Sequence, residues 1–478
     1  MVNKAVPKKI GRPIAALLVG LSAFVVAGVL YISGALDFAE YKTYDFRVRF
    51  FAERSRPSDN IALILLNQAS IDWAKEERQW SWPWPRAAYA EITDYLRLGG
   101  AASLSFDVIF SEPSLYGSGD DDEFIRASKE YGRVGQTVFF GSSTGVRQEW
   151  PGDLDAPLFD VAGFDELPRS LHMESRLPDA ASGSAMPSAA GSTAAVSVVL
   201  PIPGLRNAAG ALGNVTGIAD SDDVFRRLSP FILFEGKAVP GLSAAALMLD
   251  GSGTDIAYNR GKHSFSWGNY VIPVDRDGRA LLRFRGSLNR YSPYSAAEVL
   301  QSARDFRQGK DPLLLPEDFS GRHVFFGLYA PGLFDICTTP IDSAYPGMGM
   351  HVTMLDNMLQ GDFIRESSAG LDFVIIFAVV MLTAFISLSS SRIPLPATVA
   401  ASAALFAAVI AACFVSYEFP GLWIPMTAPL SGGLMAFLTG TLYNYATEGR
   451  QKRFIKMAFS SYLSPAVVDQ VIADPSQL

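Results

Sequence analysis

Cysteine and histidine are both scarce in this chain of 478 residues. The two cysteines are Cys337 and Cys413, and the second lies inside a long apolar run. We do not expect them to pair, so the core rather than disulfide bonds must hold the fold. The histidines show none of the paired spacing of a zinc site; they are His172, His263, His323 and His351. We therefore expect no metal ion and no cofactor in this chain.

Features of nucleotide and nucleic-acid binding are also missing. The net charge is −8, and no basic patch is interleaved with aromatic residues, which argues against nucleic acid as a partner. Neither a P-loop nor a dinucleotide-binding fingerprint occurs. Residues 141–145 match the G-x-S-x-G pattern of hydrolases, but the loop-like residues 146–151 follow where that motif needs a helix. We expect no catalytic residues here.

Long apolar runs are the most evident feature that is present. Hydrophobic residues make up 49% of the chain and are concentrated in four segments. Each is close to the ~20 residues that cross ~30 Å of hydrocarbon as a helix. The segments are residues 14–36, 370–388, 395–417 and 423–443. They predict a membrane domain of four transmembrane helices, with the lipid bilayer as a partner.

The distribution of lysine and arginine predicts the orientation of these helices. Positive clusters precede the first segment, follow the fourth, and include Arg392 between the second and third. Both termini are then cytoplasmic, as residues 1–13 and 444–478, in the inner (plasma) membrane. Residues 37–369 form an external domain. A cleaved signal peptide ending near Ser33-Gly34-Ala35 is the alternative, although the apolar run is longer than the 7–15 residues usual for such peptides.

The external domain has the pattern of an α/β fold. Residues 61–66 form an unbroken apolar strand, and residues 86–98 form a helix that ends at Gly99-Gly100. Further strands are expected at 102–107, 134–140 and 322–328, with helices at 123–131 and 348–359. Hairpin strands are expected within 224–234 and 264–284, with a turn at Glu235-Gly236. Residues 177–196 are a low-complexity loop rich in Ala, Ser, Gly and Pro.

Several short motifs resemble the second type of CHASE sensor domain and keep that family's order. They are Tyr44-Asp45-Phe46-Arg47-Val48-Arg49, Trp82-Pro83-Trp84-Pro85-Arg86, residues 99–107, Asp275–Gly278, Arg283–Gly286, Phe334-Asp335 with Thr339-Pro340, and Pro346-Gly347 with His351. The resemblance implies an exported sensor between one N-terminal helix and three later ones, with an unknown extracytoplasmic ligand. One departure is Asp220-Ser221-Asp222-Asp223, where the family has Asp-x-Asp-Gly.

The motifs supply candidate sensing residues, each with a structural alternative. The candidates are Trp82, Trp84, Arg86, Asp107, Asp335 and His351. The tryptophans would either form a ligand platform or fix a helix entry. Asp107 is more readily a strand end than a metal ligand, and His351 more readily a helix-start residue. The acidic run 120–123 favours a helix start over a calcium site.

The C-terminal residues give a second resemblance. Residues 454–475 resemble the linker that enters the catalytic domain of class III adenylate or guanylate cyclases. The residues that carry this signal linker are Phe454, Ala458, Tyr462, Ser464 and Pro465. The resemblance implies a cyclase domain after Leu478 that uses ATP with Mg or Mn, and homodimerisation to complete its active sites. Residues 1–478 alone are then expected to have no enzymatic activity.

Small residues recur every four positions in the fourth apolar segment, as Ala428, Gly432, Ala436 and Gly440. Such a stripe lets two helices approach closely. It is a candidate dimer interface, and packing against the first or third apolar segment of the same chain is the alternative. Two other functions remain open, namely the sensor half of a histidine or Ser/Thr kinase and a membrane binding protein that acts without an output domain.

Overall fold

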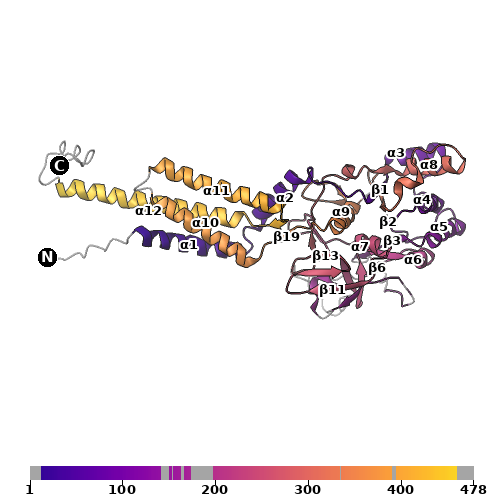
Figure 1. The fold of residues 1–478 in the computed structure, drawn as a ribbon, viewed down its shortest axis with the longest axis horizontal. Coiled ribbons are helices and arrows are strands. Elements are labelled where there is room, and N and C mark those ends of the chain that lie inside the picture. Colours follow the sequence, from indigo (N-terminus) through magenta and orange to yellow (C-terminus); the bar gives the residue numbers. More distant parts are fainter. Residues whose placement is uncertain are drawn as a thin grey trace, which may run out of the picture. The chain divides into compact units, whose positions relative to one another are not determined.

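The chain folds into two compact units, each described here by itself (Figure 1). The computed structural model describes residues 12–141, 150–152, 154, 156–162, 166–173, 197–333, 335–389 and 394–459. The helical unit comprises Met1–Arg47 and Glu366–Leu478, and the α/β unit comprises Val48–Arg365. The first boundary between the two units falls within residues 37–52. The reason is that residues 37–52 form a helix, α2, whose first part packs with the helical unit. The loop predicted at 177–196 lies outside the described residues.

A seven-stranded sheet forms the centre of the α/β unit. Its strands are β15 (Tyr294–Ser295), β1 (Ile61–Leu66), β16 (His323–Leu328), β2 (Ser103–Asp107), β3 (Val134–Gly141), β6 (Ser197–Val199) and β7 (Ala211–Asn214). They run in the order β15-β1-β16-β2-β3, with β6 and β7 both paired to β3. All pairs are parallel except β3 with β6, which is antiparallel. The predicted strands at 61–66, 102–107, 134–140 and 322–328 are thus confirmed within a residue or two.

Helices cover both faces of this sheet, which is why β1 is buried along its whole length. One face carries α3 (Gln68–Glu77), α4 (Arg86–Gly99), α5 (Ser118–Tyr131) and α8 (Ala296–Arg307), and the other carries α7 (Leu242–Met248) and α9 (Gly347–Gln360). Ile64 and Phe106 point to the first face and share a core with Tyr89 and Leu300. The short α6 (Pro203–Ala208) adds Leu205 to that core.

The glycine signals at helix ends and hairpins are confirmed. Gly100 ends α4 in the left-handed conformation, with φ of 70°, where a side chain would be strained. Glu235 and Gly236 both have positive φ and join β9 to β10. The remaining strands of this unit are β4 (Asp160–Ala162), β5 (His172–Met173), β8 (Arg227–Leu228), β9 (Phe231–Phe234), β10 (Lys237–Pro240), β11 (Asp255–Asn259), β12 (Ser264–Trp267), β13 (Tyr270–Pro273), β14 (Ala280–Leu281), β17 (Ile336–Cys337) and β18 (Tyr345–Pro346).

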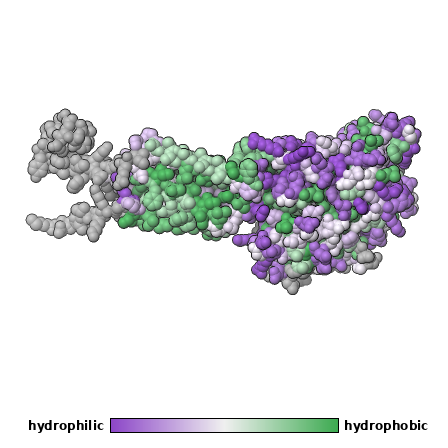
Figure 2. Space-filling model, viewed as in Figure 1, coloured by the Kyte–Doolittle hydropathy of each residue, from purple (hydrophilic) through white to green (hydrophobic). Residues whose placement is uncertain are grey.

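The helical unit contains four long helices. They are α1 (Arg12–Ile32), α10 (Ala369–Leu388), α11 (Leu395–Glu418) and α12 (Thr427–Phe459). In the described part of the chain, α1, α10 and α11 are long and apolar enough to cross a membrane. Apolar residues cover much of their surface in Figure 2. The first part of α12 is the predicted fourth span. Its glycine, serine and threonine residues lower its mean hydropathy, so α12 is not among the helices that are apolar enough to cross a membrane by composition.

The small-residue stripe of α12 packs inside the helical unit. Ala428 and Ala436 are fully buried in a core shared with α1 and α10. A Cβ on Gly432 would lie 2.8 Å from the side chains of Ala27 and Val380, and Gly440 lies against Ser387. The stripe therefore lets α12 approach α1 and α10, so the intrachain alternative is confirmed for the first segment, whereas the second partner is the second segment and not the third. It offers no free face to a second copy.

Candidate functional site

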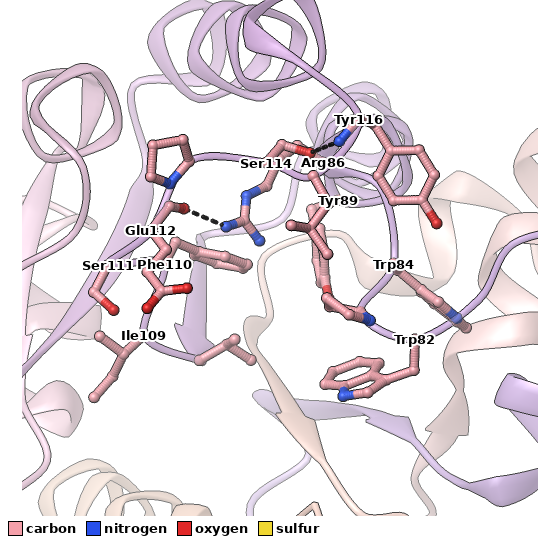
Figure 3. Close-up of a pocket in the computed structure, with 14 residues that line it drawn as sticks. Trp82, Trp84, Arg86, Tyr89, Ile109, Phe110, Ser111, Glu112, Ser114 and Tyr116 are labelled. Carbon is pink, nitrogen blue, oxygen red and sulfur yellow. Dashed lines mark hydrogen bonds between the residues drawn. The ribbon is translucent and has the colours of Figure 1, made fainter.

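A surface pocket of about 230 Å³ lies at the start of α4 (Figure 3). One wall is the Trp82–Arg86 motif, which precedes α4, and the other is the segment 108–116, which follows β2. Aromatic rings dominate the lining, from Trp82, Trp84, Tyr89, Phe110 and Tyr116. The structure thus brings Trp82, Trp84 and Arg86 together in the lining of one pocket.

Arg86 supplies the positive charge of this pocket. Its guanidinium group lies 4.5 Å from the ring centre of Phe110. Its Nε donates to Asp121 Oδ1 at 3.4 Å, and its Nη2 donates to the carbonyl oxygen of Glu112 at 2.9 Å. Among the described residues, its Nη1 has no hydrogen-bond partner. The side chain is therefore held in place while it keeps donors to spare.

The acidic run at the start of α5 holds the two helices together. The two carboxylate oxygens of Asp120 accept hydrogen bonds from the backbone N–H groups of Arg86 and Ala87, at 2.6 and 2.8 Å. Asp121 accepts one from the backbone of Ser114 at 2.9 Å. Asp120 thus replaces the missing side-chain cap of α4. Among the described residues, no group of three or more His, Cys, Asp or Glu is arranged to hold a metal ion.

The two tryptophans of the motif differ in exposure. Trp84 is almost fully buried and packs on Trp80, with ring centres 6.1 Å apart. Its Nε1 has no hydrogen-bond partner in the described structure. Trp82 is only partly buried. Trp84 thus anchors the loop that enters α4, whereas Trp82 presents part of its surface at the pocket.

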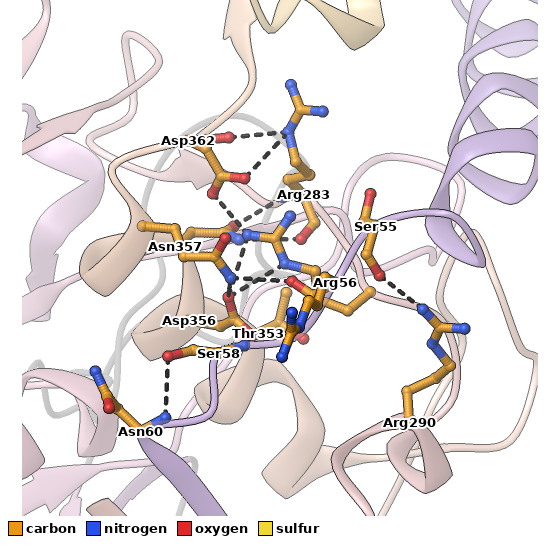
Figure 4. Close-up of polar contacts among 12 residues, drawn as sticks. Ser55, Arg56, Ser58, Asn60, Arg283, Arg290, Thr353, Asp356, Asn357 and Asp362 are labelled. Atoms are coloured by element: carbon orange, nitrogen blue, oxygen red, sulfur yellow. Dashed lines mark hydrogen bonds and ion pairs between the residues drawn. The ribbon is translucent and has the colours of Figure 1, made fainter. Parts of the chain in front are cut away.

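A second polar cluster surrounds Asp356, a fully buried residue on α9 (Figure 4). Its carboxylate accepts hydrogen bonds from the backbone of Ser58 at 3.1 Å and from the hydroxyl of Tyr291 at 2.8 Å. It also forms an ion pair of 3.1 Å with Arg285. These contacts join the segment that follows α2 to the C-terminal half of α9.

The neighbouring residues extend this cluster. Arg285 forms a second ion pair with Asp362 at 2.7 Å. The side chain of Asn357 makes two hydrogen bonds to the backbone of Arg283, at 2.8 and 3.0 Å. Sequence analysis missed Asp356 and Asn357. Two adjacent polar residues in the mainly apolar segment 348–359 were the signal that could have revealed them.

A third polar cluster lies in the helical unit, around Glu40 of α2. Its carboxylate accepts hydrogen bonds from the backbone of Met426 at 2.7 Å and of Thr427 at 2.9 Å. It also accepts from the indole Nε1 of Trp423 at 3.0 Å and pairs with Arg47 at 2.7 Å. Glu40 and Arg47 are both buried. A carboxylate on α2 therefore caps the N-terminus of α12.

Comparison with known protein families identifies the chain. A model of the CHASE2 domain matches residues 21–388. The chain belongs to the CHASE2 family. CHASE2 is an extracytoplasmic sensor domain. No curated protein matches this chain, and no solved structure does.

The CHASE2 match begins within α1 and ends with the last residue of α10. It therefore includes the pocket and the Asp356 cluster, and it includes Glu40. The helices α11 and α12 lie beyond it. The resemblance first seen in short motifs is thus confirmed for the sensor, whereas the cyclase resemblance rests on the C-terminal residues alone.

Three candidate sensing residues of the CHASE2 domain do not line the pocket, namely Asp107, Asp335 and His351. Asp107 ends β2, where burial raises the pKa of its carboxyl group to about 7 and the nearby charge of Asp335 adds to this shift. Burial raises the pKa of the Cys337 thiol to about 12, and the same two carboxylates add to this shift. Asp107, Asp335 and Cys337 therefore form a small acidic cluster at the end of β2.

His351 is buried on α9, within the second turn of the helix. Burial lowers the pKa of its imidazole to about 4, so the ring is neutral. It has a hydrogen bond with the backbone of Val215, and its Nδ1 has no partner in the described structure. This buried environment favours a structural role for His351 over a role in ligand sensing.

The departure from the family pattern at Asp220 also has a structural explanation. The carboxylate of Asp220 pairs with Arg226 at 3.3 Å and with Arg227 at 2.6 Å. Asp223 takes up positive φ in the turn, as the missing glycine would. The turn survives the substitution, and Asp220 is committed to buried ion pairs.

Proposed function

We propose that this chain is the sensing and membrane-spanning part of a receptor. Its CHASE2 domain senses an extracytoplasmic cue and passes the response to a cytoplasmic output domain. That domain is a class III nucleotide cyclase, which with Mg or Mn makes cyclic AMP from ATP (or cyclic GMP from GTP). The observation that carries the proposal is the contact between Glu40 of α2 and the first turn of α12.

The helix α2 has fixed partners at both of its ends. In its first part, Glu40 caps α12 and Arg47 donates to the carbonyl oxygen of Ile424 at 2.9 Å. In its last part, Arg49 donates to the carbonyl oxygen of Pro340 at 2.6 Å. A change in the α/β unit that displaces the Arg49 contact would therefore act on a helix that also holds the start of α12.

The helix α12 is long enough to carry such a displacement through a bilayer. Its 33 residues extend for about 50 Å, against the ~30 Å of a hydrocarbon core. The basic residues near its end favour the cytoplasmic side; they are Arg450, Lys452, Arg453 and Lys456. We infer from these features that α12 is a fourth transmembrane helix and that both termini are cytoplasmic.

The cyclase assignment rests on the sequence beyond this helix. Phe454 and Ala458 of the linker motif lie within α12, and Tyr462, Ser464 and Pro465 lie outside the described residues. A homodimer follows from the same assignment, because class III cyclases complete their active sites between two catalytic domains. Its interface would use faces other than the Ala428–Gly440 stripe.

The test is to isolate the native gene product with an antibody against the α/β unit, measure its mass, and assay it for cyclic nucleotide synthesis. We expect a product at least ~20 kDa heavier than 51.7 kDa, one ordinary further domain, that converts ATP to cyclic AMP. A heavier product that transfers phosphate to a protein instead would show the kinase alternative. A product of 51.7 kDa without activity would contradict the receptor proposal and favour the stand-alone binding protein.

A further inference from the structure

We propose that the pocket at the start of α4 binds a small, neutral, planar aromatic molecule that carries one hydrogen-bond acceptor, such as an aromatic amide. This inference rests on the proposed function in one respect, namely that the bound molecule is the cue that the receptor senses. The binding itself is a property of the α/β unit and is argued from the pocket alone.

The position of the pocket favours a ligand site. Segment 108–116 leaves the carboxyl end of β2, and the Trp82–Arg86 motif leads into the N-terminus of α4 (Figure 3). In open parallel sheets, ligands bind outside the carboxyl ends of the strands. The pocket therefore lies where this class of sheet normally places its ligands.

The size and lining of the pocket restrict the ligand. Its volume of about 230 Å³ is below the roughly 300–1,000 Å³ of sites for drug-sized compounds, so one or two rings fill it. The rings of Trp82, Tyr89, Phe110 and Tyr116 contribute to its walls. Planar aromatic ligands gain offset or edge-to-face contacts with such walls, each worth roughly 0.5–1.5 kcal/mol beyond the buried area.

The polar groups of the pocket require an acceptor. Arg86 is held by Asp121, by Glu112 and by the ring of Phe110, and its Nη1 is left with donors to spare. Trp84 also lines the pocket, but its Nε1 is buried away from the pocket surface, so Arg86 is the donor that a ligand can reach. A ligand oxygen that accepts a hydrogen bond from this charged donor gains affinity.

The surrounding charges favour a neutral ligand over an anion. Asp121 contacts the guanidinium group of Arg86 directly, and Asp120 caps the helix that begins there. Glu112, which lines the pocket, adds a third carboxylate to this neighbourhood. Because the positive charge of Arg86 is already offset, a ligand carboxylate would meet net repulsion, whereas a carbonyl oxygen would not.

The test uses the full chain in detergent micelles and three probes of similar size and different charge, namely benzamide, benzoate and benzylammonium. Binding is measured by calorimetry. We expect saturable binding of benzamide with a dissociation constant at or below about 1 mM, and at least tenfold weaker binding of the two charged probes. Trp82→Ala and Arg86→Lys should each weaken benzamide binding at least tenfold. Tyr270→Ala, a change of an aromatic residue on the β13 hairpin, should leave it unchanged.

Equal binding of benzamide by the Trp82→Ala variant, or preference for benzoate or benzylammonium, would overturn the proposal. Trp82 is only partly buried, so this variant should fold even where Arg86→Lys does not. No output domain is needed for the measurement. Absent binding beside intact cyclic nucleotide synthesis would reject the pocket and keep the receptor, and the reverse result would reject the receptor and keep the pocket.

Discussion

The carboxylate of Glu40 accepts hydrogen bonds from both the backbone N–H and the hydroxyl group of Thr427, at 2.9 and 3.0 Å. Thr427 is the first residue of α12, and Glu40 precedes it by 387 residues in sequence. The pair joins the helix that enters the CHASE2 domain to the helix that we propose carries the signal inward.

We expect Glu40→Ala to destabilise the helical unit by roughly 3–5 kcal/mol. The change leaves the buried guanidinium group of Arg47 without its carboxylate and leaves the N-terminus of α12 uncapped. Thermal unfolding in detergent, followed by the circular dichroism of the helices, measures this loss. Glu53→Ala is the control. Glu53 directly follows the last residue of α2 and its side chain is exposed, so this substitution should change the stability by less than about 1 kcal/mol. Equal effects of the two changes would contradict the cap.

Removal of the Asp356 carboxylate should destabilise the α/β unit by a similar amount. Asp356→Ala leaves Arg285 with Asp362 as its ion-pair partner and leaves the hydroxyl of Tyr291 without its acceptor. Urea unfolding followed by tryptophan fluorescence provides the measurement. Asp59→Ala, which breaks the exposed pair with Arg56, should cost less than about 0.5 kcal/mol. If both variants unfold at the same urea concentration, the Asp356 cluster does not hold the two segments.

Asp107 should make the α/β unit less stable as the pH rises. Its carboxyl group has a raised pKa of about 7 in the folded state, against roughly 3.9 when unfolded. Between these values the folded state binds more protons, so the free energy of unfolding falls by up to about 1.4 kcal/mol per pH unit. Asp107→Asn should remove this decline, as urea unfolding at several values between pH 4.5 and 7.5 would show. An unchanged slope in the variant would contradict a carboxyl group that is protonated in the fold.

His351 should act in the opposite direction. Its pKa is lowered to about 4 in the folded state, so the unfolded state binds more protons between pH 4 and roughly 6.5. The contribution of the neutral ring is therefore complete above about pH 6.5 and is lost as the pH falls. His351→Gln should flatten the acid side of the stability profile. A steeper profile in this variant would show that the histidine is charged in the fold.

A larger residue at Gly432 should disturb packing within one chain rather than association of two. The Cβ of Gly432→Leu would meet the side chains of Ala27 and Val380, and overpacking of this kind costs roughly 1–3 kcal/mol. We expect a lower unfolding temperature in detergent. The control is Leu438→Val, at an exposed position of the same helix. A dimer that dissociates while the chain keeps its unfolding temperature would restore the stripe to the dimer interface.

Local patterns in the sequence were enough to predict much of the CHASE2 fold. The apolar run 61–66 is buried on both faces, and Gly100 ends α4 where the glycine pair indicated. The helix α8 was missed although Ser295 and Glu298 form a capping box, which is a readable signal. The helix α2 offered no such signal, because its polar and apolar residues show almost no helical periodicity.

Contacts between distant parts of the sequence explain the remaining differences. The Trp82–Arg86 motif marked the pocket, because its residues are neighbours in the chain. Glu40 gave no comparable signal, since its partners Trp423 and Thr427 are almost 400 residues away. The small-residue stripe of α12 could pack equally well on a second copy of the chain or on helices of the same chain. The choice between them depends on how α1 and α10 pack. Such choices are tertiary and leave no local pattern.

The most direct test of the receptor is the side of the membrane on which each unit lies. Asp277→Cys places a thiol on an exposed turn of the α/β unit, and Gln451→Cys places one beyond the apolar part of α12. Native Cys337 and Cys413 are buried, and the wild-type chain measures their background labelling. We predict that a membrane-impermeant maleimide labels Asp277→Cys in intact spheroplasts and labels Gln451→Cys only after permeabilisation. Labelling of both positions without permeabilisation, or the reverse pattern, would contradict a receptor that carries an external cue into the cytoplasm.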